Sequence, residues 1–321
     1  MTAQYDVVAV GNAIVDILQV VPEAFLAEHA IAKNAMTLID EARADELTAL
    51  FGQATIAAGG SAANTATGVA SFGARAAYIG KVAQDQLGRD YAAAFAREGV
   101  RFETRPRPAP PGTARSIIAV TPDGHRSMNT YLGASTMLDS SDLDAPLIQS
   151  GAITFLEGYL FDRPEAKMAF VRAAEIAAAA DRKVALTLSD VFCVERHRES
   201  FRHLVAGHID ILFANEAEIL NLYETQSLDE ALNAAKSVCP IVAVTRSEHG
   251  SVIAAGAETH KVPAAPVARV VDSTGAGDLY AAGFLYGYAA SRPLAACGAL
   301  GSLAAAEVIS HMGPRPEKSL K

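Results

Sequence analysis

Short runs of apolar and β-branched residues recur along the chain, and longer stretches with helical character separate them. The strand-like runs are residues 6–10, 76–80, 153–156, 184–188, 209–213, 241–245, 252–255 and 267–271. The helix-like stretches are residues 63–72, 89–98, 165–180, 228–238, 279–290 and 294–310. Continuously apolar strands that alternate with helices predict an α/β fold, in which a doubly wound, mostly parallel sheet carries helices on both faces and forms three layers.

Two regions interrupt this alternation. Residues 14–21 and 36–39 have strand character and only a short connection between them. Residues 114–120 and 126–131 flank a Thr-Pro-Asp-Gly turn, which predicts a β-hairpin, and the proline-rich stretch 106–111 leads into it. We therefore predict a small β-sheet lid of residues 13–40 and 111–132. It is inserted into a large α/β domain of residues 1–12, 41–110 and 133–321.

The segment Asp272-Ser-Thr-Gly-Ala-Gly-Asp278 carries the most specific chemistry, because it joins the predicted strand at 267–271 to the apolar helix at 279–290. Gly275 and Gly277 allow backbone N–H groups to converge at a helix N-terminus, where the dipole also favours an anion. Asp278 places a carboxylate beside this anion cradle, where it is suited to accept a proton from an attacking hydroxyl. The pattern indicates phosphoryl transfer to an alcohol. The structural alternative is an Asp that only caps the helix.

A second glycine cluster begins at Gly59-Gly60-Ser61 and runs into a helix of small residues that contains Asn64. The two glycines permit a ligand to approach the backbone, and the Asn64 amide offers a donor and an acceptor to neighbouring hydroxyls. A tight loop capped by Ser61 is the structural alternative. A dinucleotide-binding Gly-x-Gly-x-x-Gly is absent from the sequence, and Gly80-Lys81 lacks the upstream glycine of a Walker loop.

Polar residues also follow the first strand. Asn12 and Asp16 are four residues apart, and Asp16 stands in an otherwise apolar stretch, where a buried carboxylate needs a partner. The two adjacent hydroxyls of a sugar would supply that partner. An exposed position on an alternating strand explains Asp16 equally well.

Asn215 and Glu218 follow the strand-like run at 209–213 and start a helix, so one turn places them on the same face. This pair could order hydrated Mg²⁺ beside nucleotide phosphates. The same spacing is that of an N-cap Asn with a capping-box Glu, and the two interpretations are compatible.

The composition narrows the function classes. The chain has 321 residues, of which 50% are hydrophobic, and a formal net charge of −9. Such a size and composition favour a compact enzyme, and the negative charge opposes binding to nucleic acid or to an acidic membrane. The three cysteines, Cys193, Cys239 and Cys297, are widely spaced and predict buried thiols, not a zinc site. No signal peptide or membrane-spanning run is recognised, so we expect a cytoplasmic protein.

Taken together and in this order along the chain, the Gly-Gly-to-Asn64 segment, the Asn215-x-x-Glu218 turn and the segment from Asp272 to Asp278 resemble the ribokinase-like (PfkB) family of sugar and nucleoside kinases. The resemblance covers essentially the whole chain, lid included. Two positions depart from the family's usual glycine, namely Ala83 and Ser247. The resemblance implies a ribokinase-like fold, ATP and Mg²⁺, and it leaves a requirement for K⁺ open.

For the phosphate side, the resemblance implies that Asp278 is the base and that Gly275, Ala276 and Gly277 form the anion hole. Arg126 would swing in with the lid to meet the transferring phosphoryl group. Residues expected near ATP are Thr245, Thr274, Gly250, Asn215 and Glu218, with Glu218 near the metal through water.

For the acceptor side, the resemblance implies a sugar or ribose site formed by Asn12, Asp16, Gly59, Gly60, Ser61 and Asn64. An aromatic side chain is expected against a base, and the candidates are Tyr159 and Phe161, each of which also fits an ordinary core position.

Within the family, the sequence is more similar to adenosine kinases than to sugar kinases. Gly11-Asn12 with Asp16, the hairpin around Arg126, the stretch 210–218 and the closing Met312-Gly313 all fit adenosine kinases. The Asp-x-Asn-x-Arg pattern of many sugar kinases is replaced by residues 187–192. The expected reaction is the conversion of adenosine to AMP, a step of purine salvage, and the alternative is phosphorylation of a free sugar. Inosine and guanosine stay open as acceptors, as does the choice between a monomer and a homodimer.

Overall fold

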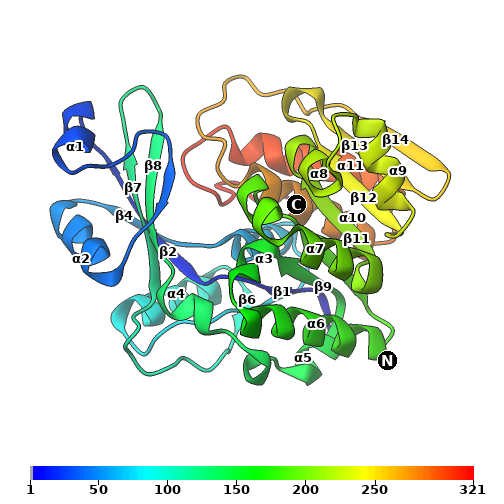
Figure 1. Ribbon diagram of the computed structural model, residues 1–321, viewed down its shortest axis with the longest axis horizontal. Helices are drawn as coiled ribbons and strands as arrows, with labels where there is room; N and C mark the ends of the chain where they lie inside the picture. Colours follow the sequence, from blue (N-terminus) through cyan, green and yellow to red (C-terminus); the bar gives the residue numbers. More distant parts are fainter. Residues whose placement is uncertain (1–2) are drawn as a thin grey trace.

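The computed structural model describes residues 3–321 (for residue 162, the backbone only), and a nine-stranded sheet forms its centre (Figure 1). Seven neighbouring strands run parallel, and two antiparallel strands extend one edge. In spatial order the strands are β14 (Glu258–Val262), β13 (Ser251–Ala255), β12 (Ile241–Thr245), β11 (Ile211–Asn215), β10 (Lys183–Thr187), β9 (Gly151–Glu157), β1 (Tyr5–Val10), β5 (Ala76–Ile79) and β6 (Val100–Phe102).

Helices cover both faces of this sheet, because successive strand residues point to opposite sides and both sides are apolar. In β1, Val7 and Ala9 belong to one core cluster, and Val8 and Val10 belong to the other. The first core is covered by α3 (Ser61–Ser71), α4 (Gln86–Arg97), α10 (Ala276–Ala289) and α11 (Leu294–Val308). The second is covered by α5 (Ala145–Ser150), α6 (Pro164–Ala179), α7 (Val191–His208), α8 (Glu216–Tyr223) and α9 (Leu228–Lys236). The predicted three-layer α/β fold is confirmed.

A second, five-stranded sheet stands beside the large domain (Figure 1). Its hairpin forms across the Thr-Pro-Asp-Gly turn as predicted. In spatial order its strands are β3 (Met36–Leu38), β8 (Arg126–Tyr131), β7 (Ala114–Val120), β2 (Ile14–Val20) and β4 (Thr55–Gly59). The short α1 (Glu23–Glu28) and α2 (Glu41–Leu50) accompany it, and 3₁₀ turns occur at Gly133–Met137, Ser140–Asp142, Gly158–Asp162 and Ser247–His249.

The small sheet uses more of the chain than the sequence analysis assigned to it. β4 lies within residues 41–110, which were given to the large domain, yet it pairs antiparallel with β2 and forms an edge of the small sheet. Helix α2 also packs against β7 and β8. The run Thr-Ile-Ala-Ala-Gly has a single β-branched apolar residue, so its own sequence carried little strand signal, and pairing with β2 decides its conformation.

The strand predicted at 267–271 is wrong. Residues 263–274 form an irregular connection between β14 and α10, and the Val270 side chain is 59% exposed. Pro263 and Pro266 remove two ladder donors, and the Val271 N–H bonds to the Ile309 carbonyl after α11. The β-branched residues therefore gave a false strand signal.

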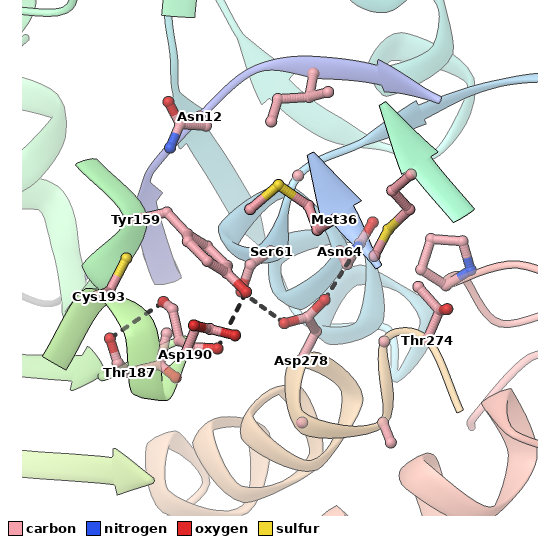
Figure 2. A pocket seen from close by; sticks show the side chains of 18 of the residues that line it. Asn12, Met36, Ser61, Asn64, Tyr159, Thr187, Asp190, Cys193, Thr274 and Asp278 are labelled. Carbon is pink, nitrogen blue, oxygen red and sulfur yellow. Dashed lines mark hydrogen bonds between the residues drawn. The ribbon is translucent and has the colours of Figure 1, made fainter. Parts of the chain in front are cut away.

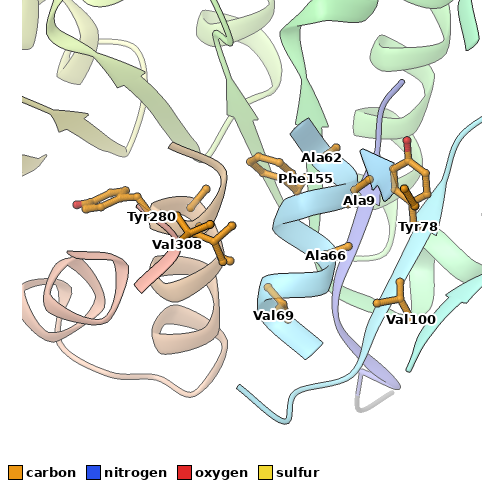
Figure 3. Packing of buried hydrophobic residues seen from close by; sticks show 14 of the residues in the cluster. Ala9, Ala62, Ala66, Val69, Tyr78, Val100, Phe155, Tyr280 and Val308 are labelled. Carbon is orange, nitrogen blue, oxygen red and sulfur yellow. The ribbon is translucent and has the colours of Figure 1, made fainter. Parts of the chain in front are cut away.

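Close helix packing sets the position of α10, which carries Asp278 (Figure 3). The small residues of α3, Ala62, Ala66 and Val69 among them, are buried between the large sheet and α10. On the other side of α10, a Cβ added at Gly283 would lie 2.4 Å from the Leu300 carbonyl oxygen of α11. The backbones of α10 and α11 can approach closely only because this position is glycine.

Replacing Gly283 with Ala is therefore expected to lower the free energy of unfolding by about 1–3 kcal/mol, because the backbone of α11 must shift. Gly207 near the end of α7 provides the matched control, since a Cβ there meets nothing within 4 Å. Gly207→Ala is expected to leave stability unchanged or raise it by about 0.5–1 kcal/mol. Thermal unfolding of both variants checks these expectations. A Gly283→Ala variant as stable as Gly207→Ala would contradict this account of the α10–α11 contact.

Within residues 3–321, no helix has both the length and the apolar character that crossing a membrane requires.

Candidate active site

A cavity of about 420 Å³ opens where the carboxyl ends of the large-sheet strands face the small sheet (Figure 2). Ligands of open α/β sheets commonly bind at such an edge. The structure brings most of the predicted site residues to its wall: Asn12, Asp16, Gly60, Ser61, Asn64, Tyr159, Asn215, Glu218, Thr245, Thr274, Gly275, Ala276, Gly277 and Asp278. Gly59, Arg126 and Gly250 do not line this cavity.

Asp278 lies in the first turn of α10, at the centre of the cavity wall (Figure 2). Its Oδ1 accepts a hydrogen bond of 2.6 Å from Ser61 Oγ, and its Oδ2 accepts one of 2.9 Å from Asn64 Nδ2. Burial raises the pKa of Asp278 to about 6, although the two hydrogen bonds oppose this rise. A carboxylate with such a pKa is ionised at neutral pH and can still take up a proton.

The turn before α10 presents the helix N-terminus to the cavity. Gly275 has φ 79°, and a Cβ there would lie 2.7 Å from the Pro314 carbonyl oxygen, so glycine is needed on two counts. A Cβ at Gly277 would meet nothing within 4 Å, so the backbone there is open to the cavity. The N–H groups of this first turn lie at a helix N-terminus, a position that favours an anion, and the Ala276 N–H also donates to the Ser273 carbonyl at 3.3 Å.

Asp16 is another carboxylate on the wall, and no hydrogen bond to it occurs among the described residues. Burial raises its pKa to about 7, against the opposing charges of Arg315 and Arg126. A Cβ at Gly59 would lie 2.2 Å from Asp16 Oδ2, so Gly59 provides the space for this carboxylate and does not line the cavity itself. An acceptor of this kind is available to ligand hydroxyls.

Glu157, at the end of β9, holds Asn12 and the start of α3 through hydrogen bonds and was not singled out by the sequence analysis. Its Oε1 accepts from the Asn12 backbone N–H at 3.2 Å and from Asn12 Nδ2 at 2.9 Å, and its Oε2 accepts from the Ala62 N–H at 2.7 Å. Burial raises the pKa of Glu157 to about 7, and these hydrogen bonds oppose the rise. Its sequence signal was a glutamate directly after a continuously apolar strand.

Arg126 lies against the turn that precedes α10. Its Nη2 is 2.5 Å from Asp272 Oδ2, and its Nη1 donates to Thr274 Oγ1 at 3.0 Å. Asp272 Oδ1 also accepts from the Thr274 N–H at 3.0 Å. Arg126 therefore links β8 of the small sheet to the loop that precedes α10. Contact between Arg126 and a phosphoryl group stays a prediction.

Asn215 and Glu218 form the capping box that the sequence allowed, and both line the cavity. The Asn215 N–H and Nδ2 donate to Glu218 at 2.9 and 2.6 Å, and the Glu218 N–H donates to Asn215 Oδ1 at 2.8 Å. Burial raises the pKa of Glu218 to about 7. Within residues 3–321 no group of three His, Cys, Asp or Glu side chains could hold a metal, so Glu218 belongs to no such cluster.

The remaining predicted residues divide between the cavity and the structural framework. Tyr159 reaches the cavity, and its hydroxyl donates to the Ser189 carbonyl at 3.1 Å (Figure 2). Phe161, the other aromatic candidate, is instead buried and stacks on Phe201 at 4.3 Å. Gly250 has φ 78° and lies against the Val262 carbonyl, so its conformation serves the turn into β13.

The small sheet adds an apolar wall that the sequence analysis missed. We call this set the lid wall: Ile14, Met36, Leu38, Ile118, Met128 and Leu132, all of which line the cavity. Met36 and Leu38 are each 47% exposed. The sequence shows that these residues are apolar and that strand alternation can place them on one face. Only the position of the small sheet over the cavity shows that this face lines the cavity.

Comparison with known proteins identifies the family. Residues 29–319 match the pfkB family of carbohydrate kinases. The chain belongs to the PfkB kinase family. An adenosine kinase from Sinorhizobium meliloti is 52% identical, with a TM-score of 0.92 over 99% of this chain and 98% of that chain. A probable sugar kinase protein from Rhizobium etli CFN 42 is 50% identical, with a TM-score of 0.93 over 99% of this chain and 97% of that chain. The adenosine kinase of Saccharomyces cerevisiae is 26% identical over 331 residues, covering 96% of this chain and 95% of that protein.

This PfkB-family protein therefore has the ribokinase-like fold and is an ATP-dependent kinase of a nucleoside or a sugar. Its two departures from the family's usual glycine, Ala83 and Ser247, do not line the cavity. Ser247 has φ 51°, the left-handed region where glycine is favoured. Ala83 forms an isolated bridge with Arg107 beside the chain that leads into the lid.

Proposed function

We propose that this PfkB-family kinase transfers the γ-phosphoryl group of ATP to the 5′-hydroxyl of a purine nucleoside, with adenosine as the acceptor and AMP as the product. The lid wall is the observation that carries this choice. A free sugar is covered with hydroxyls and gains little from a wall of Met, Leu and Ile side chains. A purine gains from burial against that surface.

The ribose is assigned to the polar groups between the lid wall and Asp278. Asp16 accepts from the two adjacent ribose hydroxyls, and Asn64 and the Gly60 backbone lie along the same wall. Asn12, held by Glu157, and Ser61 complete this side. The purine would then lie on the lid wall, with Tyr159 as the aromatic neighbour.

Asp278 is assigned as the general base, which removes the proton of the 5′-hydroxyl as the oxygen attacks the γ-phosphorus. Gly275, Ala276 and Gly277 would stabilise the phosphoryl oxygens through the N–H groups at the start of α10. Thr274 and Thr245 line the cavity on the assigned ATP side, and closure of the lid on the substrates would bring Arg126 toward the transferring group.

We assign Mg²⁺ to the phosphate side of this site, near Asn215 and Glu218. A magnesium ion is commonly held by one or two carboxylates, substrate phosphates and water. Glu218 and Asn215 meet that description as a water-mediated contact, because the Glu218 carboxylate is already committed to its capping hydrogen bonds. When bound, Mg²⁺ would neutralise charge on the ATP phosphates.

The test is ADP release from ATP and Mg²⁺ with adenosine, inosine, guanosine, ribose and fructose as acceptors. We expect the kcat/KM for adenosine to exceed that for ribose by about 10²-fold or more, because the base buries apolar surface on the lid wall. Omission of Mg²⁺ should abolish turnover. A higher kcat/KM for a free sugar than for any nucleoside would keep the kinase assignment and overturn the nucleoside.

A further inference from the structure

The C-terminal segment after α11 returns to the active site, although it lies far from the other site residues in sequence. It runs on the side of the large domain that faces the small sheet, where it is coloured red in Figure 1. The Gly313 N–H donates to Asp272 Oδ2 at 2.8 Å, and Pro314 lines the cavity. The next residue, Arg315, thereby lies against Asn64 of α3 and Phe95 of α4.

Arg315 is held firmly there. Its Nη1 forms an ion pair with Glu98 at the end of α4, and its guanidinium lies over the Phe95 ring at 5.0 Å. Its side chain is only 12% exposed. Its Nε is then 3.4 Å from Asn64 Oδ1, to which it donates. Arginine can hold two partners at once in this way because its donors form a rigid fork.

This contact bears on Asp278 through the amide of Asn64. An amide has a donor end and an acceptor end, and the two can exchange by rotation. With Oδ1 accepting from Arg315, the Nδ2 end must face Asp278, where it donates to Oδ2 at 2.9 Å. A series of polar contacts therefore runs from Glu98 through Arg315 and Asn64 to Asp278.

Arg315 also acts on Asp16 through its charge. Four charged groups influence the Asp16 carboxylate: Arg315 of the C-terminal segment, Arg126 of β8, Asp278 of α10 and Asp272 of the preceding loop. The two arginines favour the ionised form, and the two carboxylates oppose it. Arg315 is the larger of the two favourable influences. An ionised Asp16 accepts hydrogen bonds from both ribose hydroxyls, whereas a protonated one has lost part of that capacity.

We propose that Arg315 is a positioning residue of this kinase, which holds the Asn64 amide in the orientation that donates to Asp278. This role rests on the proposed function. It makes the C-terminal segment part of the active site, although Arg315 itself reaches the reacting groups only through other residues.

Steady-state kinetics between about pH 5.5 and pH 9 on Arg315→Gln and Arg315→Lys test the role. Arg315→Gln removes the charge, so the acidic limb of kcat/KM for adenosine is expected to move up by about one pH unit. Its kcat/KM should be about 10-fold below wild type at neutral pH and recover most of that loss at about pH 9, where Asp16 is ionised without help. Arg315→Lys keeps the positive charge but lacks the planar guanidinium with its several donors. We expect this variant to keep the wild-type acidic limb of the kcat/KM profile and to lower kcat several-fold.

Arg172→Gln on α6 is the matched control, because Arg172 pairs only with Glu175 on its own helix among the contacts described. Loss of activity in Arg315→Gln by the same factor at every pH, with a lower Tm, would show a structural role and overturn the proposal. If Arg315→Gln does not fold, Arg315→Lys still decides, since wild-type kcat in that variant would also overturn it. A wild-type enzyme that phosphorylates no nucleoside would instead reject the proposed function itself.

Discussion

Replacement of Asp278 by Asn is expected to lower kcat by about 10²–10⁴-fold and to leave KM for ATP and adenosine within a few-fold of wild type. The amide has nearly the size of the carboxylate and lacks only its basicity. Asn64 Nδ2 can still donate to the amide oxygen, and the Ser61 hydroxyl can rotate to accept from the amide nitrogen. The fall in kcat therefore measures the contribution of proton removal by Asp278.

The pH dependence provides a second readout for Asp278. A base must be deprotonated to act, so the kcat of the wild-type enzyme should rise with pH through about 6, the pKa to which burial raises Asp278. The residual activity of Asp278→Asn should lack this limb. Asp229→Asn, in the first turn of α9, is the control for an Asp-to-Asn change at a helix start outside the cavity. Wild-type kcat in Asp278→Asn would exclude Asp278 as the base.

Replacement of Asp16 by Asn is expected to lower kcat/KM for the nucleoside by about 10²-fold or more, because a hydrogen bond to a charged group contributes about 1.5–3 kcal/mol and two ribose hydroxyls lose such a partner. Most of the effect should appear in KM for the acceptor, while KM for ATP should stay unchanged. Initial rates with each substrate varied in turn separate the two. An unchanged acceptor KM would remove Asp16 from the ribose site.

The same variant is expected to be more stable than wild type at alkaline pH. Burial raises the pKa of Asp16 to about 7 in the folded protein, so between the unfolded pKa and about 7 the folded state binds more protons than the unfolded one. Stability contributed by this group is therefore present at low pH and lost as pH rises through about 7. Asp16→Asn removes that loss.

Thermal unfolding at about pH 6 and pH 8.5 checks this sign, with a larger gain in Tm for Asp16→Asn at the higher pH. Asp181→Asn is the matched control, because Asp181 has a left-handed φ of 57° that asparagine also adopts readily. A variant less stable than wild type at about pH 8.5 would contradict this account of Asp16 as a buried carboxylate.

Local signals were enough for much of the fold. The parallel strands were visible as continuous apolar runs, and the hairpin of β7 and β8 was visible from its Pro-Asp-Gly turn. The capping box of Asn215 and Glu218 follows from their spacing, and the place of Asp278 at a helix start follows from the glycines before it. Each of these features involves residues close in sequence, so periodicity and turn chemistry suffice to predict it. The same signals failed at residues 267–271, where β-branched residues have no neighbouring strand to pair with.

The tertiary structure alone decided which side chains meet. Asn64 and Asp278, 214 positions apart, share a hydrogen bond because α3 packs on α10. Glu157 reaches Asn12 because β9 is the neighbour of β1. Arg315 reaches Asn64 because the chain turns back after α11. Contacts of this kind depend on strand order and helix packing, which no local pattern of apolar and polar residues specifies. By itself the sequence determined most of the elements and the place of Asp278 at a helix start, and packing between distant segments determined which side chains line the cavity.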